Sequence, residues 1–356
     1  MAKIELIDVA HSYVPGLYAV KDINLTWEDG VASALLGPSG CGKTTLLKII
    51  SGLLTPSEGQ ILLNGQDVTK LSPRERNVAQ VFQFPVVYET LNVFDNLAFP
   101  LRNRSVPENE IKARVEEIAE ILELQQVLQH NANRLGAAEK QRISMGRGIV
   151  RADTAAVLFD EPLTVIDPQH KWHLRRKLKE LHQRTKFTMV YVTHDQHEAL
   201  TFAEQVTVMD VGLALQTGTP QALHEYPQTP FVGYFIGSPG MNVFPAQPHA
   251  EGLQIGEHVV KMAANGLDGQ RPYQLGIRPE HIVTSDEEQI GALACHVTAV
   301  TPTGHSQILD LQGGGLTFKA RIAEDKPVQI GQTQWATFPP KRLMVYADEQ
   351  LMSRKE

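Results

Sequence analysis

An eight-residue segment of the chain has the residue types that bind a nucleoside triphosphate. It reads Gly37-Pro38-Ser39-Gly40-Cys41-Gly42-Lys43-Thr44 and lies between an apolar run at 31–36 and a helical pattern at 45–51. Glycines let backbone N–H groups approach phosphate oxygens, and a helix start favours negative charge. Lys43 would reach the β- and γ-phosphates, and the Thr44 hydroxyl would bind Mg²⁺. The spacing therefore predicts a phosphate site and not a chance glycine-rich turn.

Three further residues could act on a phosphate that this segment holds. Asp160 and Glu161 follow the apolar run 155–159, and His194 follows the run 189–192. Open α/β sheets bind ligands at the carboxyl ends of their strands, so these side chains would lie near the phosphates. We expect Asp160 to serve Mg²⁺, Glu161 to polarise an attacking water and His194 to donate to the γ-phosphate. Taken alone, the acidic pair would as often cap a helix, and a single histidine is more often structural.

The elements that must position these residues form an α/β domain with a mainly parallel sheet. Short apolar runs, typical of buried strands, occupy 31–36, 155–159, 189–192 and 206–209. Between the first two lies a helical insertion, because apolar residues recur there with helical spacing. These residues, after a Pro107 near the helix start, are Ile111, Val115, Ile118 and Leu122.

After about residue 236 the sequence pattern changes to short β-like pieces separated by glycine and proline. The pieces are 274–277, 292–300, 307–311 and 316–322. They predict a second, all-β domain in which 303–305 and 313–315 form hairpin turns.

Composition and charge exclude several classes of protein. The 356 residues include 33 Lys and Arg against 40 Asp and Glu, and the net charge of −7 disfavours sequence-independent binding to nucleic acid. Two cysteines, Cys41 and Cys295, form neither a disulfide framework nor a zinc motif, which indicates a reducing compartment. No apolar stretch approaches the roughly 18 residues that span a bilayer, and no export signal is visible. We therefore expect a chain that does not itself span a membrane.

With these motifs in this order, the chain resembles the ATP-binding subunits of ABC transporters of the carbohydrate-import type. Segments 235–242 and 275–281 are similar to the regulatory domain of that subgroup. The resemblance implies a P-loop NTPase (RecA-like) core at 1–235, with a helical subdomain at about 88–147. It also implies an OB-like all-β domain at 236–356.

The resemblance assigns roles to individual residues of the nucleotide site. Tyr13 matches the aromatic residue that stacks on adenine, and Thr45 belongs with the phosphate-binding loop. Gln83 matches the glutamine that approaches Mg²⁺ and the attacking water. Asp167 matches an aspartate that touches the other ATPase subunit, although Asp167-Pro168 also fits a helix N-cap with a first-turn proline.

The resemblance also implies partners. An importer of this kind contains two permease subunits and works with an external solute-binding protein, and its ATPase subunits lie at the cytoplasmic face of the inner membrane. The segment 86–99 matches the surface that receives a permease helix. Four of its side chains either line an apolar groove or belong to the core: Val86, Val87, Tyr88 and Phe94. An alternative function is a soluble ABC-type ATPase that acts on nucleic acid or the ribosome, but the helical insertion is small for that class.

One motif departs from the pattern of the family. The family signature reads Leu-Ser-Gly-Gly-Gln, whereas this chain has Leu135-Gly136-Ala137-Ala138-Glu139. Gly136 supplies no hydroxyl, and Glu139 brings negative charge to a segment that closes over the γ-phosphate on the opposite subunit. We therefore predict a heterodimer with a second, different ATPase, the arrangement of the glycerol importers in this group; the alternative is a homodimer that tolerates these changes. The transported solute is expected to be a sugar or polyol, including glycerol.

Overall fold

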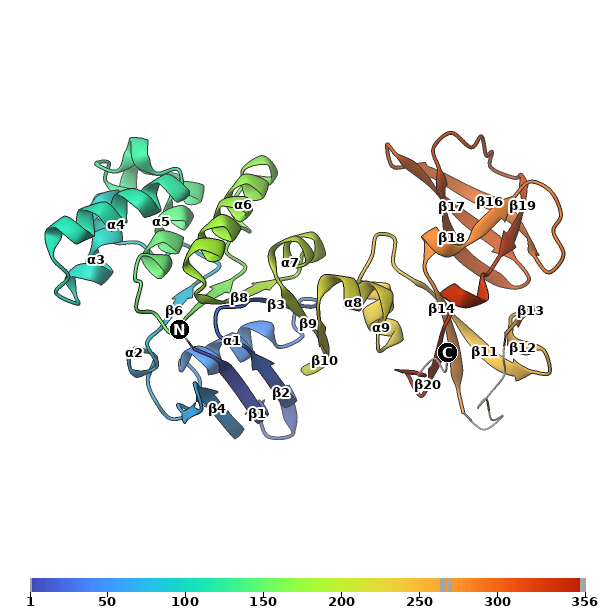
Figure 1. Ribbon diagram of the computed structural model, residues 1–356, viewed down its shortest axis with the longest axis horizontal. Helices are drawn as coiled ribbons and strands as arrows, with labels where there is room; N and C mark the ends of the chain where they lie inside the picture. Colours follow the sequence, from blue (N-terminus) through green and yellow to red (C-terminus); the bar gives the residue numbers. More distant parts are fainter. Residues whose placement is uncertain (1, 263–266, 268–270, 353–356) are drawn as a thin grey trace. The chain divides into compact units, whose positions relative to one another are not determined.

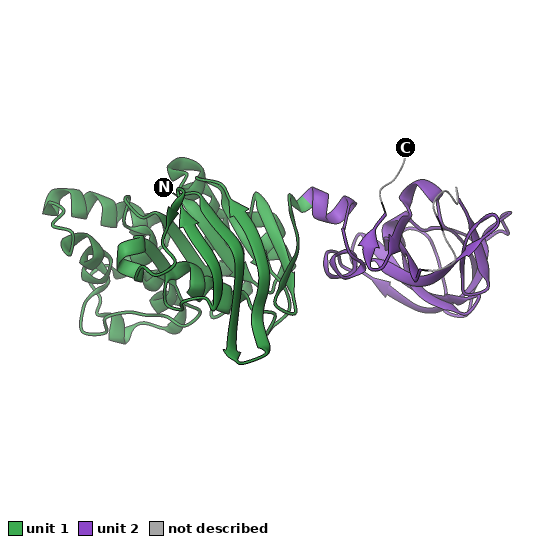
Figure 2. Ribbon diagram, turned by 90° about the horizontal axis from the view of Figure 1, so that it is seen from below, with its two compact units in different colours: residues 1–220 green, residues 221–356 purple. Residues whose placement is uncertain are grey.

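The computed structural model describes residues 2–262, 267 and 271–352 (Figure 1). The chain divides into two compact units, residues 1–220 and 221–356 (Figure 2). No helix among the described residues is long and apolar enough to cross a membrane.

The first unit is built on a six-stranded sheet in the order β10-β9-β3-β8-β7-β6. Neighbouring strands run parallel except β10, which pairs antiparallel with β9. The strands are β3 (Ala32–Leu36), β6 (Val78–Val81), β7 (Ala156–Asp160), β8 (Thr188–Thr193), β9 (Gln205–Asp210) and β10 (Leu213–Gly218). Every residue of β3, β7 and β8 is buried, which confirms the predicted α/β class and explains why these strands are apolar throughout.

A second, antiparallel sheet in the order β2-β1-β4-β5 completes the core of the first unit. Its strands are β1 (Ile4–Val14), β2 (Leu17–Trp27), β4 (Glu58–Leu63) and β5 (Gln66–Asp67). Helix α1 (Lys43–Ser51) belongs to a buried cluster with residues of both sheets, including Ile4 and Trp27 on one side and Leu158 on the other. The phosphate-binding segment is therefore anchored by a helix in the centre of the core.

The helical insertion contains three longer helices (Figure 1). They are α3 (Val93–Arg102), α4 (Glu108–Ile121) and α5 (Ala137–Ile149). Ile111, Val115 and Ile118 are fully buried, as their spacing predicted. The remaining short helices of this unit are α2 (Pro73–Arg76), η1 (Gln125–Val127) and η2 (Ala132–Arg134), and α6 (Pro168–Thr185) and α7 (Gln196–Phe202) flank β8 in the sequence.

The second unit is all-β apart from short helices. One sheet has the order β13-β12-β11-β14-β20-β21 and the other β15-β19-β16-β17-β18. Their strands are β11 (Asn242–His249), β12 (Gly252–Ile255), β13 (His258–Lys261), β14 (Tyr273–Ile277), β15 (Val283–Ser285), β16 (Leu293–Pro302), β17 (Ser306–Gly313), β18 (Leu316–Ala323), β19 (Thr333–Thr337), β20 (Met344–Ala347) and β21 (Gln350–Leu351). The predicted hairpins are present, and Gly314 and Gly315 adopt φ values of 55° and 75° between β17 and β18.

The short helices at the start of the second unit are held by a buried arginine. These helices are α8 (Pro220–Glu225) and α9 (Pro230–Phe235); η3 (Pro279–His281) and η4 (Pro340–Arg342) lie further along the chain. Arg278 is 1% exposed and donates to the carbonyl oxygens of His224 at 2.8 Å and Ile236 at 2.6 Å. These bonds tie 221–236 to the β-strands. The two compact units divide after Pro220, the first residue of α8, so the boundary expected at 235/236 lies within the residues of the second unit.

Candidate functional site

The glycine-rich segment forms the turn from β3 into α1. Gly42 has a φ of 101°, and a Cβ at this position would lie 2.4 Å from the carbonyl oxygen of Ala19, so only glycine fits. Lys43 is 5% exposed, and its ammonium group donates to the carbonyl oxygens of Gly37 at 2.8 Å and Pro38 at 2.9 Å. The cation is thus fixed at the mouth of the turn, beside the backbone that is expected to hold phosphate.

The other residues of the segment differ in exposure. Ser39, Gly40 and Thr44 are exposed, Thr45 is half-buried and Cys41 is buried. Burial raises the pKa of the Cys41 thiol, which leaves it protonated and unreactive at neutral pH. Cys41 belongs to the buried core cluster, and its Sγ accepts a hydrogen bond from Lys43 Nζ at 3.8 Å.

Thr44 and Asp160 present two oxygen ligands at the end of the sheet. The Thr44 hydroxyl donates to Asp160 Oδ1 at 3.2 Å. Burial raises the pKa of the Asp160 carboxyl, and the hydrogen bond from Thr44 partly opposes this. No group of three or more His, Cys, Asp or Glu in the described part of the chain could hold a metal ion. A hydroxyl and one carboxylate suit Mg²⁺, which takes its other ligands from water and substrate phosphates.

Glu161 and His194 form a contact pair. Glu161 Oε2 lies 3.1 Å from His194 Nδ1. The Glu161 backbone has a φ of 46°, which is strained for a residue with a side chain, and its N–H donates to the Val192 carbonyl oxygen at 3.0 Å. The strained turn directs the carboxylate toward the histidine that follows the next strand. A carboxylate held by a histidine at a sheet edge can accept a proton from water.

The strand register brings the predicted residues to one edge. Asp160 pairs with Val192 and Leu36 with Thr193, so the turns after β3, β7 and β8 lie at the same level. Gln83 comes two residues after β6, which is parallel to β7 and places the glutamine at this same edge. It is half-buried, and its side chain has no hydrogen bond to the described residues.

Tyr13 lies beside the phosphate-binding turn. Its hydroxyl is 3.3 Å from Thr45 Oγ1, and its ring stands edge-on to the His11 ring with 4.7 Å between centroids. The side chain is 59% exposed. An aromatic ring that is fixed at both ends and open to solvent can stack on a planar base.

The signature segment does not present the Glu139 charge in the way that the sequence predicted. Gly136 is the N-cap of α5, and Glu139 Oε2 accepts a hydrogen bond from the Gly136 N–H at 2.7 Å. The Glu139 carboxylate therefore points back to its own helix start and does not project from it as an unpaired charge. This is one half of a capping box, because glycine has no side chain to accept the reciprocal hydrogen bond from the Glu139 N–H.

Asp167 caps helix α6. Its carboxylate accepts a hydrogen bond from the His170 N–H at 3.2 Å and lies 2.7 Å from His170 Nδ1. These hydrogen bonds lower the pKa of Asp167. Asp167 is therefore the N-cap of α6, as one of the two interpretations predicted. A contact of Asp167 with another ATPase subunit stays a prediction.

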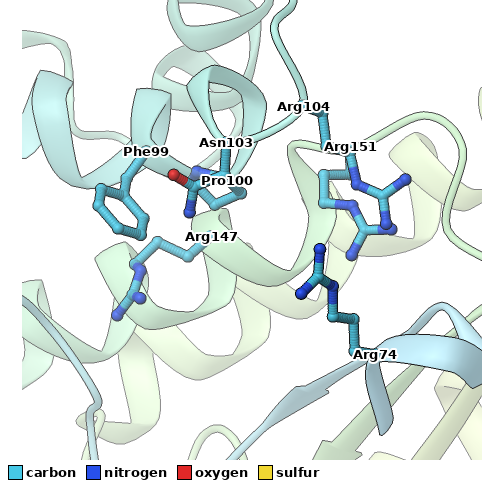
Figure 3. A pocket seen from close by; sticks show the side chains of 7 residues that line it. All are labelled: Arg74, Phe99, Pro100, Asn103, Arg104, Arg147 and Arg151. Atoms are coloured by element: carbon cyan, nitrogen blue, oxygen red, sulfur yellow. The ribbon is translucent and has the colours of Figure 1, made fainter.

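Sequence reasoning missed an arginine-rich pocket of about 800 Å³ (Figure 3). It is lined by Arg74, Phe99, Pro100, Asn103, Arg104, Arg147 and Arg151. Arg104 and Arg151 bind Asp153, whereas the Arg74 side chain has no hydrogen bond or ion pair to the described residues. The cluster spans nearly 80 positions, so no local pattern could have revealed it.

Arg147 joins the lining of this pocket to an exposed apolar segment. Phe84 is 71% exposed, and Val86 and Tyr88 are exposed as well. The Arg147 guanidinium lies 4.3 Å above the Tyr88 ring and donates to the Val86 carbonyl oxygen. Of the four side chains that the sequence singled out, Val86 and Tyr88 are exposed and Val87 and Phe94 are half-buried.

Models of known families match two parts of the chain, residues 20–164 and residues 237–345. The ABC transporter family model matches residues 20–164, the MalK OB fold domain matches 237–282 and the TOBE domain matches 275–345. The first match lies in the first unit and includes the phosphate-binding turn and Glu161, and the other two lie in the second unit.

Relatives and solved structures point to the same family as these models. The sn-glycerol-3-phosphate import ATP-binding protein UgpC of Pectobacterium atrosepticum is 38% identical over 95% of this chain and 96% of its own length. The Escherichia coli protein of the same name is 37% identical over 98% of this chain and 99% of its own length. The dimeric bacterial ABC transporter cassette MJ0796 matches with a TM-score of 0.56 and 28% identity over 61% of this chain and 98% of that one. The chain therefore belongs to the ABC transporter family, as an import ATP-binding subunit with a P-loop core and C-terminal OB and TOBE domains.

Proposed function

We propose that ATP is hydrolysed at the sheet edge where β3, β7 and β8 end, with Glu161 as the group that takes a proton from the attacking water. The Glu161–His194 contact at 3.1 Å carries this proposal. Lys43 and the backbone of the turn would hold the phosphates, and His194 would keep the carboxylate in place. Thr44 and Asp160 would hold Mg²⁺, which neutralises charge on the phosphates.

Replacing Glu161 tests the proposal. In Glu161→Gln the side chain keeps its size but loses its basicity, so turnover should fall by about 100-fold or more while ATP still binds. Glu120→Gln, on the exposed face of α4, is the matched control and should leave turnover unchanged. Turnover of Glu161→Gln at the rate of the unaltered chain would show that another group takes the proton.

The chain is the ATP-hydrolysing subunit of an ABC importer and is peripheral to the cytoplasmic face of the inner membrane. It works with permease subunits and a solute-binding protein. The alternative of a soluble ATPase acting on nucleic acid has no support among these relatives, since they are named as import proteins.

The solute we propose is a three-carbon polyol. The relatives are named for import of sn-glycerol 3-phosphate. A pair of two different ATPases, which the altered signature suggests, is the arrangement of the glycerol importers that the sequence resembles. Uptake of labelled glycerol and of labelled sn-glycerol 3-phosphate, compared between cells with the chain and cells with Lys43→Ala, distinguishes the two. Uptake of neither would exclude this class of solute.

The permease helix would dock on the exposed apolar segment and the arginine pocket beside it. Phe84 and Val86 offer apolar contacts, and Arg74 offers an unpaired positive charge. A partner that fits both surfaces carries apolar side chains next to a carboxylate. Arg74→Glu should weaken uptake without reducing ATP hydrolysis by the isolated chain, and Arg184→Glu on α6 is the control. Equal uptake by both variants would exclude this docking position.

The ATPase pair would contain two different chains. Gly136 offers no hydroxyl, and the carboxylate of Glu139 already occupies the N–H of its own helix start. This signature would contribute little to a γ-phosphate on another subunit, whereas the chain's own phosphate site keeps all its expected side chains. Brisk ATP hydrolysis by the purified chain alone, equal to that of the importer complex, would favour a homodimer instead.

A further inference from the structure

The turn that carries His194 is supported by a buried carboxylate that the mechanism above does not use. Glu198 on α7 is 5% exposed. Its Oε2 accepts hydrogen bonds from the Tyr191 hydroxyl at 3.1 Å and the Thr193 hydroxyl at 3.0 Å. Burial and the nearby Glu198 raise the pKa of Tyr191 well above its ordinary value, so this hydroxyl stays a donor.

The hydrogen bonds continue to the residues on both sides of His194. The Thr193 hydroxyl, which donates to Glu198, accepts the N–H of Asp195 at 3.0 Å. Asp195 in turn caps α7, where its Oδ1 accepts the His197 N–H at 2.8 Å. Because Thr193 and Asp195 are fixed through one hydroxyl, the backbone of His194 between them is fixed as well.

The same carboxylate faces helix α6. Glu198 Oε1 lies 3.7 Å from Lys171 Nζ, and Lys171 is one helical turn from the cap residue Asp167. Further along α6, Lys179 Nζ donates to the Thr201 carbonyl oxygen at 2.7 Å. Two lysines of α6 therefore hold α7 at both of its ends.

The charge of Glu198 is costly to bury and is not required by its hydroxyl partners. A buried carboxylate loses its hydration, and a neutral amide oxygen could accept the same hydroxyl hydrogens. What an amide would lose is the attraction of Lys171, which lies on a different helix. The charged group is therefore best explained by the link between α6 and the His194 turn.

We propose that Glu198 is a positioning residue that sets His194 against Glu161 and connects helix α6 to that pair. This inference rests on the proposed role of Glu161 and His194. A shift of α6 at its N-terminus would be passed through Lys171 and Glu198 to the turn, because packed elements move as units. The surface at the start of α6 could thereby control hydrolysis.

Substitutions of Glu198 in the full chain test the positioning role. Glu198→Ala leaves two hydroxyls without their acceptor, and we expect kcat to fall roughly tenfold while the KM for ATP changes less than about twofold. Glu198→Gln restores the acceptor, so kcat should return to within about threefold of the unaltered chain. Rates are divided by the number of chains that bind a fluorescent ATP analogue, which corrects for misfolded protein. An unchanged corrected kcat in Glu198→Ala would overturn the proposal.

Lys171 tests the link to α6 without disturbing the buried hydroxyls. In the importer complex, Lys171→Met should lower kcat by about threefold and leave ATP binding intact. Lys177→Met is the matched control, because Lys177 contacts Glu180 on its own helix. Equal rates for the two variants would contradict the link. If Glu161→Gln retained full turnover, the proposed role of Glu161 would fail. If only the Glu198 and Lys171 variants kept full turnover, the positioning role alone would fail.

Discussion

The phosphate-binding turn and the signature segment both precede a helix, but they use the start of that helix in different ways. At the turn, Gly42 caps α1 with no side-chain hydrogen bond, and the backbone N–H groups are left for a ligand. At the signature, Gly136 also caps its helix, yet the Glu139 carboxylate binds the capping N–H. One helix start is open to an anion, and the other already holds one from its own chain.

This difference shows how a composite ATP site can be unequal. In the proposed pair of ATPase subunits, the turn acts on the nucleotide of its own chain and the signature acts on the nucleotide of the other chain. Each can therefore change without the other. The residues proposed to act on the chain's own nucleotide lie together at one sheet edge, whereas the signature helix start already binds the Glu139 carboxylate.

The largest effect is expected at the phosphate-binding turn. Lys43→Ala removes the buried cation that we propose contacts the phosphates, so ATP affinity and turnover should each fall by about 100-fold or more. Equilibrium binding of a fluorescent ATP analogue measures this, with Lys70→Ala in an exposed turn as the control. Retained affinity in Lys43→Ala would remove the basis for treating the turn as the open helix start.

A smaller gain is expected from repairing the signature. Gly136→Ser, Ala137→Gly, Ala138→Gly and Glu139→Gln together restore a hydroxyl and close backbone approach while keeping a capping partner. If the signature limits hydrolysis, turnover of the chain alone should rise by about tenfold, which corresponds to about 1.4 kcal/mol. The same rate before and after repair would mean that the two helix starts do not differ in function.

The capping role of Glu139 has its own effect on stability. Glu139→Ala removes the acceptor from the Gly136 N–H, and we expect the free energy of unfolding of the chain to fall by about 1 kcal/mol. Chemical denaturation measures this change. Glu116→Ala, an exposed position inside α4, is the control, and an equal loss in both variants would show that the cap contributes nothing.

The smallest effect concerns the pH dependence of stability and comes from His182 on α6, outside both regions. Burial lowers the pKa of His182, which lies 3.1 Å from the Gly30 carbonyl oxygen. The folded chain therefore binds fewer protons than the unfolded chain below the ordinary histidine value of about 6.5. The contribution of His182 to stability is present above that pH and is lost as the pH falls below it. Thermal unfolding of His182→Gln should show a weaker acid dependence than the unaltered chain.

Much of the first unit could be predicted because its evidence is local. Fully buried parallel strands read as continuous apolar runs, and α4 showed its helical spacing directly. The antiparallel sheet was missed, since β1 pairs with both β2 and β4 through irregular registers that no single segment encodes. The residues of the phosphate site come from sequence motifs at strand ends, and parallel register brings such ends together.

The sequence could not predict features that depend on burial or on distant partners. In the sequence nothing distinguishes Glu198 from an ordinary helical glutamate, and only the folded structure shows that it is buried beside the His194 turn. Arg74 and Arg147 lie in one pocket although 73 positions separate them in the chain. Glu139 is different, because its spacing from Gly136 is a local capping pattern that the sequence already contained.

The buried Arg278 decides where the β-rich half of the molecule can be cut. A fragment that starts at residue 236 would lose the His224 carbonyl that receives one of the Arg278 hydrogen bonds, and would expose the guanidinium where α8 and α9 had covered it. A fragment that starts at residue 221 keeps the carbonyl acceptors of His224, Gly233 and Ile236. The longer fragment is therefore the one to express when this half of the protein is studied by itself.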